Sequence, residues 1–156
     1  MQAYFRRFQQ LAAAGAYQEL NALPVPKPPF FNWATEILEG LHVAAHPAKT
    51  ALVLADDAGR QEITYAELAA RANRLLNYWR GAGVRPQEAV LLMVPVCAEL
   101  WDTYVAGIKG GQVLIPTASI MTVSDLEYRF GRLLPAVVIA DLANATKIDA
   151  AEKALG

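Results

Sequence analysis

The chain has 156 residues, of which 54% are hydrophobic and 19% are charged. That length accommodates one domain with a buried core, and the composition excludes an intrinsically disordered chain. The net charge of −1 provides no field that would attract nucleic acid or an anionic membrane surface, so we expect neither as a partner.

The one cysteine, Cys97, excludes an internal disulfide and suits a reducing compartment, which predicts a cytoplasmic location. The N-terminus contains arginines but lacks the apolar run of a signal peptide, and no segment is apolar for long enough to span a bilayer. We interpret residues 1–20 as an amphipathic helix, with an arginine-containing transit peptide as the alternative.

Residues 24–29 contain four prolines in six positions, which predicts an extended linker between two helices. The second helix is expected over residues 32–46, with Asn32 as a possible N-cap. Its predicted buried stripe consists of Trp33, Ile37, Leu41 and Ala44. The linker divides the chain into an N-terminal segment, residues 1–29, and an α/β domain, residues 30–156.

A hairpin is predicted next, with strands at residues 50–56 and 61–65 around a turn at residues 56–60. Thr64 and Glu67 then form the pattern of a capping box, which predicts the start of a helix. Gly81 and Gly83 indicate its end. The predicted buried stripe of this helix is Tyr65, Leu68, Ala69, Ala72, Leu75, Leu76 and Trp79.

The remaining chain alternates strands and helices. Apolar runs at residues 89–94, 113–115 and 136–141 predict buried strands. Helices are predicted at residues 98–111, 122–135 and 143–155. The first of these should turn Leu100, Trp101, Tyr104, Val105 and Ile108 inward, and the second should begin with a capping box of Ser124 and Glu127. The order predicts an α/β fold with a mainly parallel sheet, flanking helices and an early β-hairpin.

The candidate binding segment is the loop after Ile115, because open parallel sheets bind ligands where their strands end. Its residues are small, so the backbone can approach a ligand closely. The alternative is a plain connection in which Thr122 and Ser124 only cap the next helix.

Other candidate sites have weaker patterns. His42 and His46 have a spacing that can hold zinc, but no third ligand is nearby, so a helix-end pair is preferred. Cys97 precedes a helix, which favours a somewhat lowered thiol pKa, whereas a buried structural thiol is the preferred reading. The glycines around Lys109 lack the order of a phosphate loop and are better explained as a helix C-cap. The residues 144–146 match a glycosylation sequon, but nothing directs the chain to a secretory compartment.

Several segments together resemble the N-terminal part of adenylate-forming enzymes, nearest to acyl-CoA synthetases of the acetyl, medium-chain and aryl acid type. The resemblance covers roughly residues 30–142 and is carried by "TYAEL", "IKGGQVLIPTAS" and the following "DLEYR". These enzymes convert ATP, a carboxylic acid and coenzyme A into acyl-CoA, AMP and pyrophosphate. The resemblance implies that the loop lies beside the tunnel for the pantetheine arm, with Ala118, Ser119 and Ile120 as coenzyme contacts.

The family's Ser/Thr/Gly-rich phosphate loop with its lysine, its magnesium-binding glutamate, its ribose-binding aspartate and its C-terminal-domain lysine are not found in residues 1–156. The resemblance therefore assigns no catalytic residue and no metal ligand to this chain. It implies no cofactor bound by the chain alone, and ATP, Mg and coenzyme A for full-length members. Relatives often have Gly-Asp where this chain has Gln87 and Glu88, and they often have Pro-Arg where it has Pro95 and Val96. The chain therefore lacks a possible ion pair between that aspartate and that arginine.

We therefore expect an N-terminal fragment of an AMP-forming acid–CoA ligase that is not catalytic alone. A non-catalytic binding or assembly module that retained half of the fold is the alternative, and a small nucleotide-binding α/β protein of another kind is the third. We also expect a homo-oligomer formed through an exposed sheet edge or apolar surface.

Overall fold

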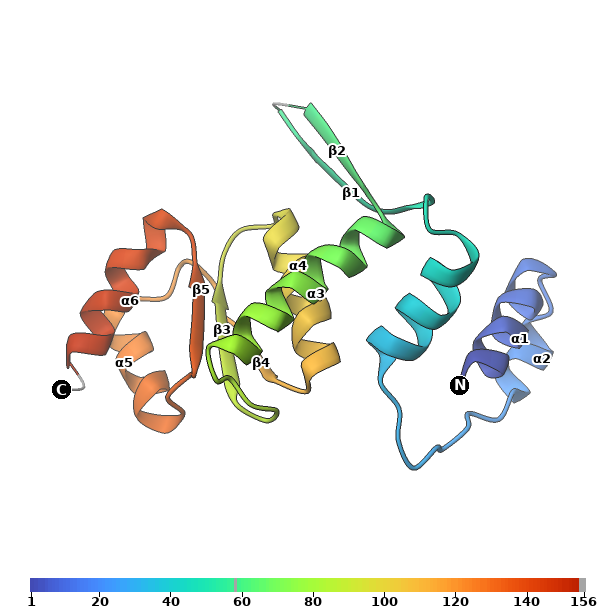
Figure 1. Cartoon of the computed structure of the whole chain (residues 1–156), viewed down its shortest axis with the longest axis horizontal. Coiled ribbons are helices and arrows are strands. Elements are labelled where there is room, and N and C mark those ends of the chain that lie inside the picture. Colours follow the sequence, from blue (N-terminus) through green and yellow to red (C-terminus); the bar gives the residue numbers. More distant parts are fainter. Residues whose placement is uncertain (58, 155–156) are drawn as a thin grey trace.

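The computed structural model describes residues 1–57 and 59–154 and shows an elongated molecule with its N-terminal helices and last helix at opposite ends (Figure 1). The elements in chain order are α1 (Gln2–Ala13), α2 (Tyr17–Ala22), η1 (Ala34–Val43), β1 (Thr50–Asp56), β2 (Gly59–Thr64), α3 (Tyr65–Gly81), β3 (Ala89–Met93), α4 (Ala98–Gly110), β4 (Val113–Pro116), α5 (Val123–Arg132), β5 (Val137–Ala140) and α6 (Leu142–Ala154). The predicted turn at 56–60 and the predicted helix at 143–155 include residues 58 and 155, which lie outside the described residues.

Three parallel strands form the main sheet, in the order β4-β3-β5. Residue Ala89 of β3 lies opposite Val113 of β4, and Val90 lies opposite Val137 of β5. Both connections between these strands are helical crossovers, which parallel pairing requires. The predicted parallel α/β arrangement with flanking helices is confirmed.

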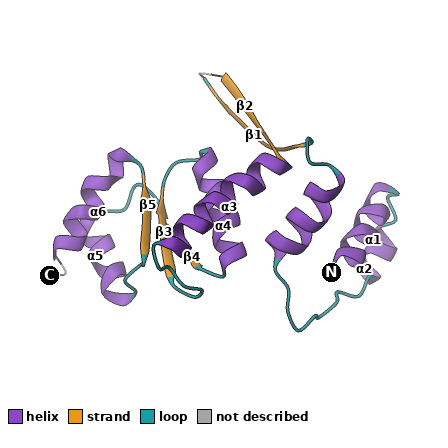
Figure 2. Cartoon of the chain, viewed as in Figure 1, coloured by secondary structure: helices purple, strands orange, loops and turns teal. Residues whose placement is uncertain are grey.

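Strand β3 separates two hydrophobic cores. Its residues are all buried, and they alternate between the two faces of the sheet. Val90 and Leu92 belong to a core shared with η1, α3 and α4, whereas Leu91 and Met93 belong to a core shared with α5 and α6. Figure 2 shows the corresponding layers, with α3 and α4 on one side of the strands and α5 and α6 on the other.

The predicted hairpin and the helix after it are confirmed. Strands β1 and β2 pair in antiparallel fashion, and the ribbon projects from the body of the molecule (Figure 1). Thr64 and Glu67 form the predicted capping box at the start of α3. The helix ends at Gly81, and the following Gly83 has a φ of 87°, while the Val84 N–H donates to Trp79 O at 2.9 Å.

The single helix expected over residues 1–20 is wrong, because the segment forms two helices separated at Gly15. Gly15 has a φ of 66°, a conformation that favours glycine. The Ala16 N–H donates to Leu11 O at 3.0 Å and the Gly15 N–H to Ala12 O at 3.1 Å, which completes a Schellman motif. A helix-ending glycine therefore overrides the helical tendency of the alanines around it.

The helix predicted over residues 32–46 is present, but residues 34–43 form a π-helix. Because a π-helix bonds residues five apart, the α-helical spacing used for the prediction misplaces two members of its stripe. Ile37 and Leu41 are buried as predicted, whereas Trp33 and Ala44 are exposed. Ala34 and Leu38 are buried with them. The predicted cap is correct, since Asn32 Oδ1 accepts from the Ala34 N–H at 3.0 Å.

The predicted inward face of α4 is partly wrong. Val105 is buried, but Trp101 and Ile108 are exposed by 39% and 40%, and Asp102 is buried in their place. The reason is an ion pair with α3, in which Arg71 Nη2 lies 2.7 Å from Asp102 Oδ2 and Arg71 Nε donates to both carboxylate oxygens. A buried aspartate is tolerated here because its charge is paired and hydrogen-bonded.

Within residues 1–57 and 59–154, none of the helices combines the length and apolar character that crossing a membrane requires.

Neighbouring aromatic residues on α3 provide a test of the packing. Trp79 is 1% exposed and Tyr78 is 73% exposed. We expect Trp79→Ala to lower the free energy of unfolding by roughly 3–5 kcal/mol, the range for truncating a buried aromatic side chain. The matched control Tyr78→Ala should change it by less than about 0.5 kcal/mol. Urea denaturation of both variants measures the difference, and equal losses would contradict the helix orientation.

Candidate functional site

The candidate loop begins as a continuation of the sheet. The Thr117 N–H donates to Leu92 O at 2.7 Å, which adds one further bond between β4 and β3 beyond the end of β4. The Thr117 side chain is buried, and its hydroxyl donates to Ile115 O at 3.2 Å. The first residue of the loop is therefore fixed by its backbone and its side chain.

The three predicted contact residues lie in the exposed part of the loop. Ala118, Ser119 and Ile120 are exposed, and Ile120 presents 88% of its surface to solvent. The Met121 N–H donates to Ala118 O at 3.1 Å, so these residues form a tight turn. The structure thus brings the three together on one short turn at the carboxyl end of β4.

A capping box closes the loop, with Thr122 as the N-cap, one of the two residues considered as caps. The Thr122 hydroxyl accepts from the Asp125 N–H at 3.3 Å, and Asp125 Oδ2 accepts from the Thr122 N–H at 2.9 Å. The predicted pair of Ser124 and Glu127 is wrong, because α5 begins at Val123 and Ser124 therefore lies inside its first turn. Hydrogen bonds from the Thr122 backbone and then its side chain lower the pKa of Asp125, so this carboxylate stays ionised at neutral pH.

Helix α6 holds the middle of the loop, which the sequence interpretation missed. Asn144 Nδ2 donates to Ser119 Oγ at 3.2 Å, and Lys147 Nζ donates to Ser119 O at 2.7 Å. Asn144 is itself fixed by Asp141, whose Oδ1 accepts from both its backbone N–H and its side-chain amide. The Asp141–Asn144 spacing, typical of a capped helix start, is the signal that could have located this end of α6.

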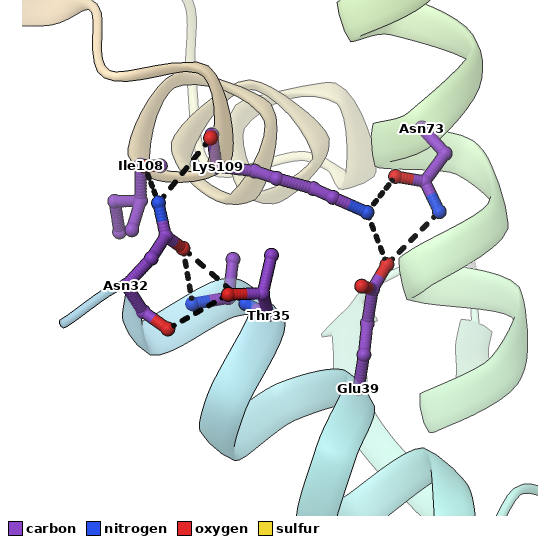
Figure 3. Close-up of polar contacts among 7 residues, drawn as sticks. Asn32, Thr35, Glu39, Asn73, Ile108 and Lys109 are labelled. Atoms are coloured by element: carbon purple, nitrogen blue, oxygen red, sulfur yellow. Dashed lines mark hydrogen bonds and ion pairs between the residues drawn. The ribbon is translucent and has the colours of Figure 1, made fainter. Parts of the chain in front are cut away.

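Lys109, considered above as part of a glycine-rich phosphate loop, is bound within the protein (Figure 3). Its ammonium group donates to Glu39 Oε1 at 2.5 Å and to Asn73 Oδ1 at 2.7 Å. Asn73 also donates to Glu39 at 3.0 Å, and Asn32 Nδ2 donates to Ile108 O at 2.9 Å. These contacts join η1, α3 and the end of α4, and Gly111 with its φ of 75° ends that helix. The helix C-cap interpretation is confirmed.

Cys97 lies in a groove of about 630 Å³ between the hairpin and the start of α4. Burial raises the pKa of its thiol, so the lowered pKa favoured by its position before a helix is wrong. The side chain is half-buried and lines the groove, so the full burial expected of a structural thiol is not observed.

The two histidines differ in their surroundings. His42 stacks on Tyr65 with ring centroids 4.8 Å apart, and His46 is exposed at the end of its helix. Within residues 1–57 and 59–154, no three side chains of histidine, cysteine, aspartate or glutamate are gathered as metal binding would require.

The first of the two departures noted in the sequence, at Gln87 and Glu88, lies directly before β3. Gln87 has a φ of 69°, a conformation that favours glycine. Glu88 retains a local ion pair, because its Oε1 lies 2.8 Å from Arg85 Nη2 and its Oε2 accepts from the Arg85 N–H. The carboxylate before β3 is therefore paired with Arg85, three residues earlier in the chain.

Comparison with known proteins defines the class of the chain. Residues 41–156 match the family model described as AMP-binding enzyme, and the chain therefore belongs to this family. It is 37% identical over 128 residues to 4-hydroxybutyrate–CoA ligase 1 of Metallosphaera sedula, covering 81% of this chain and 22% of that protein.

Solved structures show the same fold. The anthranilate CoA ligase AuaEII, in complex with anthranoyl-AMP, matches with a TM-score of 0.72 and 25% identity, over 81% of this chain and 23% of that one. A benzoate CoA ligase from Burkholderia xenovorans LB400 matches with a TM-score of 0.70 and 27% identity, over 80% and 24%. The chain thus spans less than a quarter of the length of each of these three ligases.

The polar cluster in Figure 3 provides a test with a pH dependence. Burial raises the pKa of Glu39, but hydrogen bonds from Lys109 and Asn73 together outweigh it, so the pKa lies below the ordinary 4.5. A lowered carboxylate pKa gives stability that is complete above 4.5 and is lost as the pH falls through the lower folded-state value. We expect Lys109→Met to reduce the free energy of unfolding by about 1–2 kcal/mol at pH 7, since partial exposure screens the pair.

The difference between wild type and Lys109→Met should shrink as the pH falls below 4.5. Denaturant titrations at several pH values measure it. Lys153→Met, at an exposed lysine of α6, serves as the matched control and should show no such dependence. If the difference in the free energy of unfolding stays constant down to the lowest pH, the ion pair with Glu39 is not the source of the stability that Lys109 contributes.

Proposed function

We propose that residues 30–156 form the N-terminal part of an AMP-forming acid–CoA ligase, whose overall reaction consumes ATP, a carboxylic acid and coenzyme A. The observation that carries the proposal is the exposed turn at Ala118, Ser119 and Ile120 in a member of this family. The turn lies at the carboxyl end of a parallel strand, where open α/β sheets bind ligands. Residues 1–29 form a separate N-terminal segment outside the matched range.

In this proposal, the loop forms one wall of the passage for the pantetheine arm of coenzyme A. Ile120 offers apolar surface to the arm, Ser119 offers a hydroxyl, and the small Ala118 lets the backbone approach closely. Acid activation with MgATP takes place on residues that the family has elsewhere. The cytosol, where coenzyme A is abundant and thiols stay reduced, is the compartment we propose.

Coenzyme A binding to residues 1–156 tests this assignment. We expect two-dimensional NMR to show shifts confined to the amides of residues 117–121, with a dissociation constant on the order of 1 mM, since one wall provides little affinity. Ile120→Ala should weaken binding several-fold, because it removes exposed apolar contact area. The control Val25→Ala, at an exposed valine of the proline-rich linker, should leave the titration unchanged.

MgATP at the same concentration should cause no shift in the loop, and the chain alone should catalyse no acid-dependent exchange of pyrophosphate into ATP. Coenzyme A shifts scattered over the hairpin or α3 instead of the loop would contradict the site. Pyrophosphate exchange that copurifies with the chain through successive columns would contradict the assignment of acid activation to residues outside this chain.

We also propose that the isolated chain associates with a second copy through β5. Within the part of the chain that the structure describes, β5 is hydrogen-bonded to β3 along one edge and to no strand along the other. An apolar groove of about 320 Å³ lined in part by Tyr78, Trp79 and β5 lies beside it, and Tyr78 is 73% exposed. Open edges with apolar surroundings favour pairing between chains.

Light scattering behind size exclusion should therefore give a mass that rises with concentration towards that of a dimer. Tyr78→Glu should shift the chain to monomer without lowering its melting temperature, because a charge beside the open edge opposes pairing. The control Val25→Glu, in the proline-rich linker, should not. A constant monomer mass for the wild-type chain would refute association.

A further inference from the structure

Ser119 is the one candidate contact whose polar groups are held by another element of the fold. Its hydroxyl and its carbonyl oxygen both face α6, where Asn144 and Lys147 lie one helical turn apart. Strands β4 and β5 flank β3 in parallel, so the segments that follow them meet at the same end of the sheet. The contact between the loop and α6 is thus a direct product of the strand order.

The orientation of the Asn144 amide is set by its neighbour. Asn144 is 4% exposed, and Asp141 Oδ1 accepts from its Nδ2 at 2.8 Å. Because an ionised carboxylate only accepts hydrogen bonds, the NH₂ side of the amide must face Asp141. The same nitrogen therefore donates its second hydrogen to Ser119 Oγ, at 3.2 Å. Ser119 is the acceptor in this bond, which leaves its own hydroxyl proton for another partner.

Lys147 acts on the backbone of the same residue. Its ammonium group donates to Ser119 O at 2.7 Å, a charge-assisted bond that holds the turn against α6. The neighbours Ala118 and Ile120 remain exposed on the turn. The loop is thus attached at Thr117 to the sheet, at Ser119 to α6 and at Thr122 to α5.

We propose that Asn144 and Lys147 are positioning residues for the loop, which hold Ser119 so that its hydroxyl donates to a hydrogen-bond acceptor on the ligand. The ligand part rests on the function proposed above. The acceptor chemistry that fits is a neutral carbonyl oxygen, such as the amide carbonyls of a pantetheine arm. Neither residue touches the ligand in this account, and both act through Ser119.

Hydrogen exchange of the loop amides tests positioning without any ligand. In Lys147→Met, exchange of the Met121 amide, which closes the turn, should accelerate roughly tenfold, equivalent to about 1.4 kcal/mol of lost protection. The exchange rate of the Thr117 amide, which is hydrogen-bonded to the sheet, should be unchanged, so this amide is an internal control in the same sample. Lys147→Arg should restore protection, and the control Lys153→Met, on the same helix, should have no effect. Unchanged protection of Met121 in Lys147→Met would overturn the proposal.

A double-mutant cycle tests how Asn144 acts. Asn144→Ala should weaken coenzyme A binding about tenfold in the wild-type background and have little effect when Ser119→Ala is already present, because its contribution passes through that hydroxyl. Equal effects in both backgrounds would overturn the role of Asn144. If the wild-type chain binds no coenzyme A while Lys147→Met still loosens the turn, positioning stands and the assigned ligand is wrong.

Discussion

The burial of β3 on both faces, while both of its edges are hydrogen-bonded, is the constraint on which the rest of the structure depends. A strand in that position leaves no backbone group for water, so β4 and β5 must pair with it along its length. Its alternating side chains also need two separate apolar partners, which α3 and α4 provide on one face and α5 and α6 on the other. The layers follow from these five residues.

Charged side chains have different roles in two regions of the molecule. At the carboxyl end of the sheet, the turn that carries Ser119 is exposed yet attached to three neighbouring elements, a combination that suits a surface prepared for a ligand. In the last turn of α4, the Lys109 ammonium group is paired with the Glu39 carboxylate, and this ion pair holds the π-helix η1 in place. Charged groups therefore serve packing in one region and loop geometry in the other.

Local patterns were sufficient for much of the fold. The Thr64–Glu67 capping box, the apolar stripe of α3 and the run at residues 89–94 each follow from chemistry within a few residues, and each was correctly predicted. The errors arise where a distant partner decides. Asp102 is buried because Arg71 of another helix reaches it, which displaces Trp101 to the surface. The π-helical spacing of residues 34–43 likewise has no local signature that separates it from an α-helix.

The loop residues themselves were located from the strand that precedes them and from family resemblance, but their attachment to α6 was not. Ser119 and Lys147 are separated by 28 residues, and the contact exists only because β5 returns to the far side of β3. Periodicity and capping patterns describe neighbours along one element and contain no information about such a return. The Asp141–Asn144 spacing indicates a helix start, yet it does not say what that helix faces.

The return of β5 across β3 also determines when the loop can take its final form during folding. Residues 117–121 emerge before β5 and α6, so the chain must first close two crossovers before Asn144 and Lys147 arrive at Ser119. Long-range pairing of parallel strands is slow compared with helix formation. The contact between the turn and α6 therefore requires that both crossovers have closed, so its presence indicates that the strand order is complete.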